Sequence, residues 1–181
     1  MYLDGLTTER LLFQKLKYSD ISIWEEFFQN KDILPFLGFE STLSPHELST
    51  QWIEKQLWRY KNNQYGHHAL INKKTDEFIG QAGLLTQEVN NIKEIEIAYH
   101  IIPRFRKLHY ATEAAEKVRN FAFENNICSS LISMIHEENV PSQRVAYNIG
   151  MKKEEKVHSY WRNIGRFGIF YVYRIKIESW L

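Results

Sequence analysis

The sequence predicts an α/β fold in which a mixed, mostly antiparallel central sheet carries about four helices on its faces. Three observations support this fold class. Between residues 67 and 102, three short runs of strand-like composition follow one another with turn residues between them, as in an antiparallel meander. Segments with apolar residues at helical spacing lie before and after these runs. The strand, helix and strand expected over residues 95–134 indicate one parallel pair, because parallel neighbours need a long crossover.

The length and charge balance of the chain fit a single domain over residues 1–181. The 181 residues are 44% hydrophobic and 25% charged, which is ordinary for a globular domain that buries a full core. The 23 Lys and Arg residues almost balance the 22 Asp and Glu residues. Because no overall positive field would draw the chain to a polyanion, we expect neither nucleic acid nor a membrane as its partner.

The cysteine content and the first residues favour a cytoplasmic location. Cys128 is the only cysteine, which excludes an internal disulfide and agrees with a reducing compartment. The opening sequence MYLDGLTTER has no apolar run behind a basic one, so it does not have the pattern of a signal peptide. The chain also lacks a stretch of about 18 apolar residues that could span a membrane.

The first elements predicted are a strand, a helix and a loop. Residues 10–16, RLLFQKL, indicate a strand. Ser19 or Asp20 can cap a helix over residues 21–30, where apolar residues recur at helical spacing. Residues 34–39, LPFLGF, then predict a loop.

A clearer start signal opens the second helix. Ser44, Pro45 and Glu47 occupy the N-cap, first and third positions of a capping box, and the helix is expected to run to about Tyr60. The meander follows it, with strands expected over residues 67–73, 77–87 and 92–102 and with the turns KKTD and EVNN between them.

The densest positive charge of the chain precedes the third helix. Arg104, Arg106 and Lys107 fall within four residues, directly before an alanine-rich helical pattern. On the outer side of that helix, Glu113 and Lys117 are spaced for an ion pair. Because the free N–H groups of a helix start suit a phosphate, the loop is either an anion-binding site or a solvated cationic loop. The apolar face of the helix consists of Ala111, Ala114, Ala115, Val118 and Ala122.

The last elements predicted are a strand, a short helix and a closing hairpin. Residues 129–137 indicate the strand. Asn139 can cap a helix that has Pro141 in its first turn and ends at Gly150. The two strands of the hairpin are expected over residues 152–161 and 167–177.

In order and spacing, these elements resemble the GNAT superfamily of acyl-CoA-dependent N-acetyltransferases, and within it the ribosomal-protein N-terminal acetyltransferase-like branch. TERLLFQKL resembles the first strand of the branch, FIGQAGLL the third, EIEIAYHIIP the fourth, HYATEAAEKV the cofactor helix, and HEENVPSQRVAYNIGM the closing strand and helix. The resemblance covers essentially the whole chain. It implies acetyl-CoA as cosubstrate, an amine as acceptor, and a parallel strand pair that splays around the cofactor.

The phosphate-binding loop of that family falls on residues 106–111, although relatives commonly have a glycine where Lys107 stands and a basic residue where Leu108 stands. Its pattern is Gln or Arg, two residues, Gly, one residue, then Gly or Ala. Arg106 and Ala111 fit, whereas His109 stands where glycine is expected. His109 either points away and leaves the backbone cradle intact, or donates to a phosphate itself. The resemblance implies a pyrophosphate cradle made of Arg106, Lys107, Leu108, His109, Tyr110, Ala111 and Thr112.

The resemblance also implies a place for the pantetheine arm. It would lie in the gap beyond the fourth strand, bonded to the backbone near His100, Ile101 and Ile102. Asn139 would lie beside the arm as well as capping its helix. On the residues alone, an ordinary strand end is an equally good interpretation of this segment.

Acetyl transfer to an amine needs an acid for the departing thiolate, and Ser142 is the candidate. Many relatives use a tyrosine seven residues after the asparagine, but Ala146 stands there. Tyr147 is the next residue, which places its side chain about 100° away around a helix. The ribosomal-protein branch offers a serine three residues after the asparagine, and Ser142 fits. The alternative is that Ser142 only supplements the helix cap.

For the base, the candidates are Glu96 and His158. Glu96 lies in EIEIAYHI and could take a proton from the acceptor through a water. The same alternation is typical of a half-exposed strand, which is the structural alternative. His158 could serve instead, because imidazole titrates near neutral pH. The adjacent His67 and His68 lack Cys or acidic neighbours, so we expect no metal site.

The function expected is the transfer of an acetyl group from acetyl-CoA to a primary amine, either a protein N-terminus or a small amine. The alternative is a non-catalytic CoA-binding module that acts as a sensor or in an interaction. The absence of tyrosine at position 146 and of glycine at position 109 keeps that alternative open. The sequence leaves the acceptor and the oligomeric state undetermined.

Overall fold

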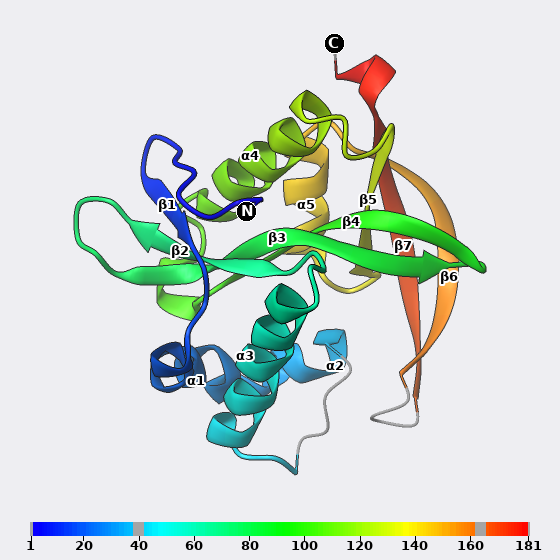
Figure 1. Ribbon diagram of the computed structural model, residues 1–181. Coiled ribbons are helices and arrows are strands. Elements are labelled where there is room, and N and C mark those ends of the chain that lie inside the picture. Colours follow the sequence, from blue (N-terminus) through cyan, green and yellow to red (C-terminus); the bar gives the residue numbers. More distant parts are fainter. Residues whose placement is uncertain (1, 38–41, 162–165, 181) are drawn as a thin grey trace.

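A seven-stranded sheet runs through the middle of the molecule (Figure 1). The computed structural model describes residues 2–37, 42–161 and 166–180, and within them the strand order is β1-β2-β3-β4-β5-β7-β6. Neighbouring strands are antiparallel except β4 and β5, which are parallel, so the predicted sheet is confirmed. The strands are β1 (Leu11–Gln14), β2 (His67–Asn72), β3 (Phe78–Val89), β4 (Ile92–Ile101), β5 (Ser130–His136), β6 (Lys152–Trp161) and β7 (Arg166–Lys176).

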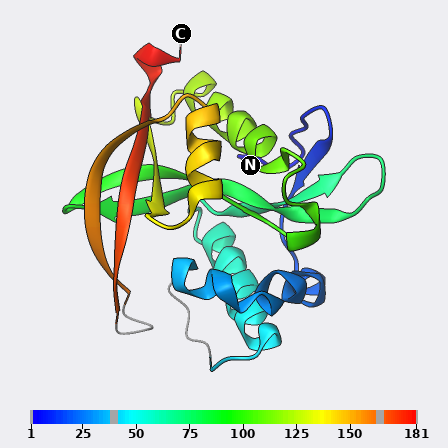
Figure 2. The same cartoon turned by 180° about the vertical axis from the view of Figure 1, so that it is seen from behind.

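Two groups of helices cover the two faces of the sheet (Figure 2). On one side lie α1 (Ile21–Gln29), α2 (Leu34–Leu37) and α3 (Pro45–Lys61), and on the other lie α4 (Tyr110–Glu124) and α5 (Val140–Asn148). Within the described ranges, no helix is both long and apolar enough to cross a bilayer. Short 3-10 turns cover Tyr18–Asp20, Lys31–Ile33, Pro103–Phe105 and Ile177–Ser179.

The alanines of α4 let this helix lie close against the sheet. Ala114, Ala115, Val118 and Ala122 have no exposed surface, as the predicted apolar face requires. Ala111 packs against the same core and is partly buried. Burial of this face holds the start of α4 in a fixed position beside the end of β4.

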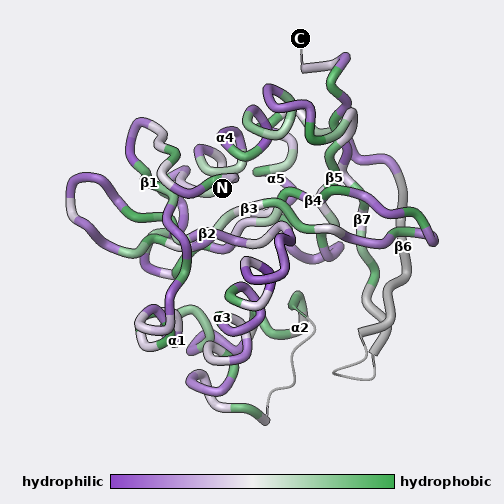
Figure 3. The backbone as a smooth tube through the Cα atoms, viewed as in Figure 1, coloured by the Kyte–Doolittle hydropathy of each residue, from purple (hydrophilic) through white to green (hydrophobic). Residues whose placement is uncertain are grey.

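An aromatic cluster fills the space under α1 and α3. The rings of Trp24 and Phe27 stack with their centroids 4.3 Å apart, and the ring centroids of Trp52 in α3 and Phe28 lie 5.9 Å apart. Figure 3 shows α3 coloured mainly for hydrophilic residues, so only a narrow side of this helix contributes to the core. Its polar remainder can therefore line a cavity or face water.

Two local predictions are wrong. Part of the expected loop at residues 34–39 is the short helix α2, whereas residues 38 and 39 lie outside the described part of the chain. Asp20 stands at the N-cap position of α1, but its side chain makes no capping bond there, because its carboxylate accepts a hydrogen bond from the backbone N–H of Lys17, with an N–O distance of 2.9 Å. The turn over Tyr18–Asp20 runs directly into α1, so Asp20 already has helical backbone angles.

Candidate active site

Strands β4 and β5 separate soon after they pair. Their only paired residues are Glu96 and Ile132, and beyond them the strands enclose a cavity of about 110 Å³. Asn139 and Ser142, from the start of α5, close one side of it. The residues of the two strands that line the cavity are Glu96, Ile97, Ala98, Tyr99, His100, Ser133, Met134, Ile135 and His136.

Side chains inserted between the two backbones hold the strands apart. The backbone N–H of Met134 donates to Oε1 of Glu96 at 2.9 Å, and Oγ of Ser133 donates to the carbonyl oxygen of Ile97 at 2.8 Å. In a regular parallel ladder both backbone groups would bond to the neighbouring backbone. The replacement leaves the edge of β4 beyond Ile97 facing the cavity, with backbone groups available to an extended ligand.

Glu96 is buried and titrates near neutral pH. It is 7% exposed, and its Oε2 accepts from Nε2 of Gln87 at 3.0 Å. Burial raises the pKa of Glu96 to about 7, and the hydrogen bonds from Met134 and Gln87 and the charge of Arg59 oppose that rise only in part. The strand alternation did not reveal this burial, and the half-exposed alternative does not hold for Glu96.

Ser142 and Tyr99 form a hydrogen-bonded pair on the opposite wall. Asn139 caps α5 as predicted, since its Oδ1 accepts from the N–H of Ser142 at 3.3 Å. Oγ of Ser142 donates to the hydroxyl of Tyr99 at 3.2 Å, and that hydroxyl donates to the carbonyl oxygen of Ser142 at 2.9 Å. Burial raises the pKa of Tyr99, so its hydroxyl keeps its proton at neutral pH. The sequence analysis missed Tyr99. A tyrosine three residues after Glu96, in a strand predicted to splay around the cofactor, was the signal that could have found it.

The helix position that holds tyrosine in many relatives contributes no hydroxyl here. Ala146 is fully buried in the core. Tyr147 is 54% exposed, and its ring lies against Tyr173 with the centroids 5.2 Å apart. Tyr147 is not among the residues that line the cavity between β4 and β5.

The loop before α4 has left-handed backbone at the two positions where relatives commonly have glycine. Lys107 and His109 have φ angles of 64° and 65°, in the left-handed region that His tolerates better than most residues. His109 is the N-cap of α4, and the carbonyl oxygen of His109 accepts from Glu113. Within the described residues, no acceptor binds the N–H groups of residues 107–112. These donors point away from the start of a helix, where an anion is favoured.

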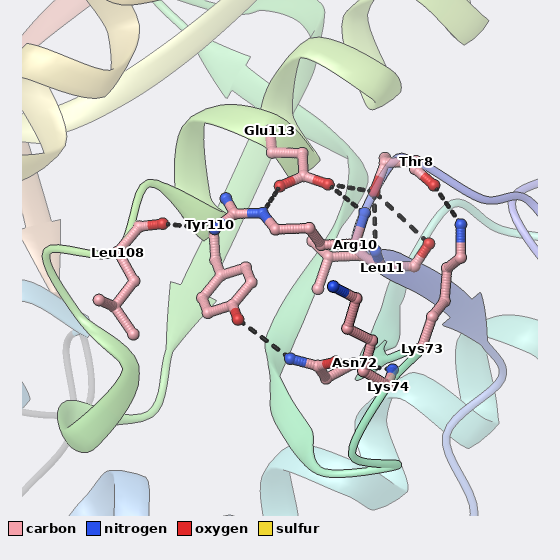
Figure 4. Close-up of polar contacts among 9 residues, drawn as sticks. All are labelled: Thr8, Arg10, Leu11, Asn72, Lys73, Lys74, Leu108, Tyr110 and Glu113. Carbon is pink, nitrogen blue, oxygen red and sulfur yellow. Dashed lines mark hydrogen bonds and ion pairs between the residues drawn. The ribbon is translucent and has the colours of Figure 1, made fainter.

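Arg10 of the first strand segment holds this loop in place (Figure 4). Its Nη1 donates to the carbonyl oxygen of Leu108 at 3.0 Å, its Nε binds Oε2 of Glu113 at 2.6 Å, and its guanidinium lies 4.2 Å from the ring centroid of Tyr110. The carboxylate of Glu113 also accepts from the hydroxyl of Thr8. The predicted partner Lys117 is therefore wrong, because the carboxylate of Glu113 faces the chain before β1 and binds both the backbone N–H and the guanidinium of Arg10 there. Such surrounding contacts allow left-handed residues to persist.

The three cations of the loop have different partners. Arg104 forms an ion pair with Glu26 of α1. Nε of Arg106 donates to the carbonyl oxygen of Ile101 at 3.1 Å, so Arg106 braces the end of β4. Lys107 is exposed and His109 is exposed beside it. Only part of the positive charge is therefore free to meet an anion.

A second cavity, of about 360 Å³, lies between α3 and the sheet. It meets the first one at Glu96, Ala98, His100 and Met134, which line both. Burial lowers the pKa of His100 to about 3, so this imidazole is neutral. The other residues of α3 and the strands that line it are Gln51, Trp52, Lys55, Gln56, Arg59, His67, Leu85, Gln87 and Phe170.

The remaining predicted positions are distributed as follows. The side chain of His158 lies outside the described part of the chain, and its backbone is in β6. His67 and His68 are buried, and among the described residues no group of three or more His, Cys, Asp or Glu side chains could hold a metal ion. The structure thus brings Glu96, Ser142 and His100 to one cavity, while the loop predicted to bind phosphate lies beyond the end of β4.

The sequence of this chain matches a known protein family and several curated proteins. The family model of the acetyltransferase (GNAT) domain matches residues 10–152. The uncharacterized N-acetyltransferase YnaD of Bacillus subtilis is 24% identical over 186 residues, which cover 97% of this chain and 98% of YnaD.

Solved structures share the fold. An acetyltransferase of the GNAT family from Bacillus anthracis superposes with a TM-score of 0.77 at 22% identity, over 96% of this chain and 98% of that one. Spermidine N-acetyltransferase from Vibrio cholerae, solved in complex with CoA and spermine, superposes with a TM-score of 0.73 at 15% identity, over 96% of this chain and 99% of that one.

Proposed function

The chain belongs to the GNAT acetyltransferase family, and we propose that it moves an acetyl group from acetyl-CoA to a primary amine. The observation that carries this proposal is the gap between β4 and β5, which opens at Glu96 onto the cavity beside α3. The cavity between β4 and β5 suits the thioester, and the cavity beside α3 suits the acceptor. We also propose that residues 1–181 form a single domain.

The residues present fit acetyl-CoA at two places. The free N–H groups of residues 107–112 and the positive end of α4 suit a pyrophosphate, with Arg106, Lys107, Leu108 and His109 in the loop and Tyr110, Ala111 and Thr112 in the helix. Around His100, Ile101 and Ile102 the end of β4 lies beside the cavity, and we expect the amides of a pantetheine arm to bond to the backbone there. The carbonyl oxygen of Ile101 accepts from Arg106 and the N–H of Ile102 donates to Ile79, so the arm would use the other backbone groups of this edge. When bound there, acetyl-CoA supplies the thioester that the amine attacks.

Glu96 is the proposed base. It lies where the two cavities meet, and its pKa of about 7 allows it to accept a proton from an ammonium at neutral pH. The neutral amine then attacks the carbonyl carbon, the new C–N bond forms, and the C–S bond breaks. The nitrogen loses a second proton as the amide forms, and the departing thiolate gains one, so the products are the amide and a free thiol. His158 remains a second candidate for this role.

Ser142 is the proposed donor to the departing thiolate. Its hydroxyl faces the β4–β5 cavity and is bonded to Tyr99, whose own proton is committed to the carbonyl oxygen of Ser142. A hydroxyl held in this way can turn toward the sulfur with little reorganisation. We expect Tyr99 to act by positioning Ser142.

Two assays on the purified protein test the proposal. Acetyl-CoA titrated by calorimetry should bind, and thiol should be released when N-terminal peptides, amino acids or other primary amines are added. No detectable binding at millimolar acetyl-CoA would overturn the cradle. If Ser142→Ala and Glu96→Gln both retained the wild-type rate, the roles given to these two residues would be wrong.

A non-catalytic CoA-binding module is the second candidate. It is favoured by Ala146, which supplies no hydroxyl, and by His109 in place of glycine. Thiol release separates the two candidates, because a module would bind acetyl-CoA and release no thiol with any acceptor.

A further inference from the structure

The cavity between α3 and the sheet is lined by two cations. We infer that the acceptor is a primary amine that also carries an anionic group, a carboxylate or a phosphate, held by Lys55 and Arg59 while the amine lies at Glu96. This inference rests on the proposed function, since it names the class of acceptor for that site.

The two cations lie on the side of α3 that faces the cavity. Gln51, Lys55 and Arg59 follow one another at intervals of four residues and all line it. Nη1 of Arg59 donates to Oε1 of Gln56 at 3.0 Å, and the same oxygen accepts from the N–H of His67 at 3.0 Å. The other guanidinium N–H groups of Arg59 have no acceptor within the described part of the chain. They are available to a ligand.

The charges of this cavity are unbalanced. Like charges four residues apart on a helix repel each other. Lys55 is exposed to solvent at the mouth of the cavity, and partial desolvation and the charge of Arg59 together lower its pKa. Among the described residues, neither cation forms an ion pair, and the only carboxyl group that lines the cavity is that of Glu96. A bound anion would offset this repulsion, whereas a polycation would add to it. Spermidine is therefore a poor acceptor for this chain.

His67 is a buried polar side chain that lacks a partner and lines the same cavity. It is 2% exposed, and neither ring nitrogen has a hydrogen-bond partner among the described residues. Its ring stacks on Trp52 with the centroids 5.4 Å apart, which fixes its orientation. Burial lowers the pKa of His67 well below its usual value, so the ring is neutral and offers one N–H donor and one acceptor. A polar ligand in the cavity would satisfy it.

The size of the cavity limits what can enter. A volume of about 360 Å³ suits a small molecule or the first residue of a peptide. Both can carry an amine and an anionic group close together, as in an amino acid, in phosphoethanolamine, or in a peptide that begins with aspartate.

The test compares acceptors that differ only in the anionic group. Thiol release is measured for β-alanine and its amide, for phosphoethanolamine and ethanolamine, for peptides that begin with aspartate or asparagine, and for spermidine. Each acceptor is assayed with the wild type, with Lys55→Gln, Arg59→Gln and the double variant, and with Lys61→Gln. Lys61 is the matched control, because it is an exposed cation of α3 that does not line the cavity.

The inference predicts that kcat/KM for the anionic member of at least one pair exceeds that for the neutral member by about tenfold or more, the worth of one charge-assisted hydrogen bond. This ratio should fall toward one in Arg59→Gln and in the double variant, and persist in Lys61→Gln. The pair that shows it distinguishes a free small amine from a peptide N-terminus.

Two results would overturn the inference while leaving acetyl transfer intact: neutral members or spermidine used as well as the anionic ones, or a preference that survives in the double variant. If acetyl-CoA binds and no acceptor releases thiol, the proposed function fails by itself. Calorimetry with β-alanine, phosphoethanolamine and the aspartate peptide then tests whether Lys55 and Arg59 form an anion site. Binding to the wild type that is lost in the double variant supports this site, and the absence of binding to the wild type refutes it.

Discussion

Glu96→Gln should stabilise the protein at alkaline pH and slow acetyl transfer. Burial raises the pKa of Glu96 from 4.5 to about 7, a difference of about 2.5. Each tenfold change in an ionisation constant corresponds to about 1.4 kcal/mol, so ionising this carboxyl in the folded protein costs about 3 kcal/mol. Glutamine has the shape of the neutral carboxyl and avoids that cost.

The pH range of the effect follows from the two pKa values. Below pH 4.5 the carboxyl is protonated in both the folded and the unfolded protein, and its ionisation has no effect on stability. Between pH 4.5 and about 7 the unfolded protein loses this proton first, so the free energy of unfolding falls as the pH rises. Above about pH 7 both forms are ionised and the full cost remains.

The substitution preserves the local hydrogen bonds. The carbonyl oxygen of a glutamine at position 96 can accept the N–H of Met134 as Oε1 of Glu96 does. Its amide can donate to Gln87 once the side-chain amide of Gln87 turns its oxygen toward it. The separation of β4 and β5 should therefore persist in the variant.

The assay is chemical denaturation of the wild type and Glu96→Gln from pH 5 to pH 8.5. Other titrating groups, such as His100 with its lowered pKa, contribute equally to both proteins and cancel in the difference. We expect the variant to gain about 3 kcal/mol relative to wild type across this range. Its kcat should fall by about 10² to 10⁴, the usual contribution of a general base. A stability difference that does not change with pH would show that Glu96 is not a buried carboxyl with a raised pKa, and an unchanged kcat would show that it is not the base.

Three further substitutions test the cradle and the start of α5. Arg10→Met removes the bonds to Leu108 and Glu113, so the affinity for acetyl-CoA measured by calorimetry should fall by about tenfold, the worth of one charged hydrogen bond. His109→Gly relieves a left-handed φ of 65° and should raise the free energy of unfolding by about 1 kcal/mol in denaturant titrations. Asn139→Ala removes the cap of α5 and should cost about 1 kcal/mol in the same titrations.

Matched variants give these predictions their controls. Lys74→Met removes an exposed cation near Arg10 and should leave the affinity for acetyl-CoA unchanged. Asn139→Asp keeps a capping oxygen and should restore most of the lost stability. A tenfold drop in the acetyl-CoA affinity of His109→Gly would mean that the imidazole itself contacts a phosphate. An unchanged acetyl-CoA affinity in Arg10→Met would mean that the loop before α4 binds the cofactor without the contacts of Arg10.

The sequence predicted those parts of the fold that depend on local patterns. The turn residues between β2, β3 and β4 gave the meander in its correct order, and the capping box at Ser44 gave the start of α3. Both signals lie within a few residues of the element that they define. The same holds for Asn139, whose side chain caps its own helix.

The site could be predicted only in part, because its decisive contacts join distant residues. Arg10 binds Leu108 across 98 positions, and Tyr99 binds Ser142 across 43. The local rule for ion pairs predicted Lys117 for Glu113, and the distant Arg10 replaced it. Glu96 is a similar case. A strand with alternating glutamate and isoleucine has the same sequence pattern whether the glutamate is exposed or buried, and only the contact with Met134 of β5 shows that Glu96 is buried.

A crystal structure of the protein with bound CoA would show whether the loop before α4 and the gap between β4 and β5 hold the cofactor. We expect the pyrophosphate at the N–H groups of residues 107–112 and the pantetheine arm along β4 past His100. The sulfur should then lie between Ser142 and the point where the cavities meet at Glu96. A CoA bound elsewhere, or one whose sulfur points away from Glu96 and Ser142, would mean that the gap between β4 and β5 is not the acetyl-transfer site.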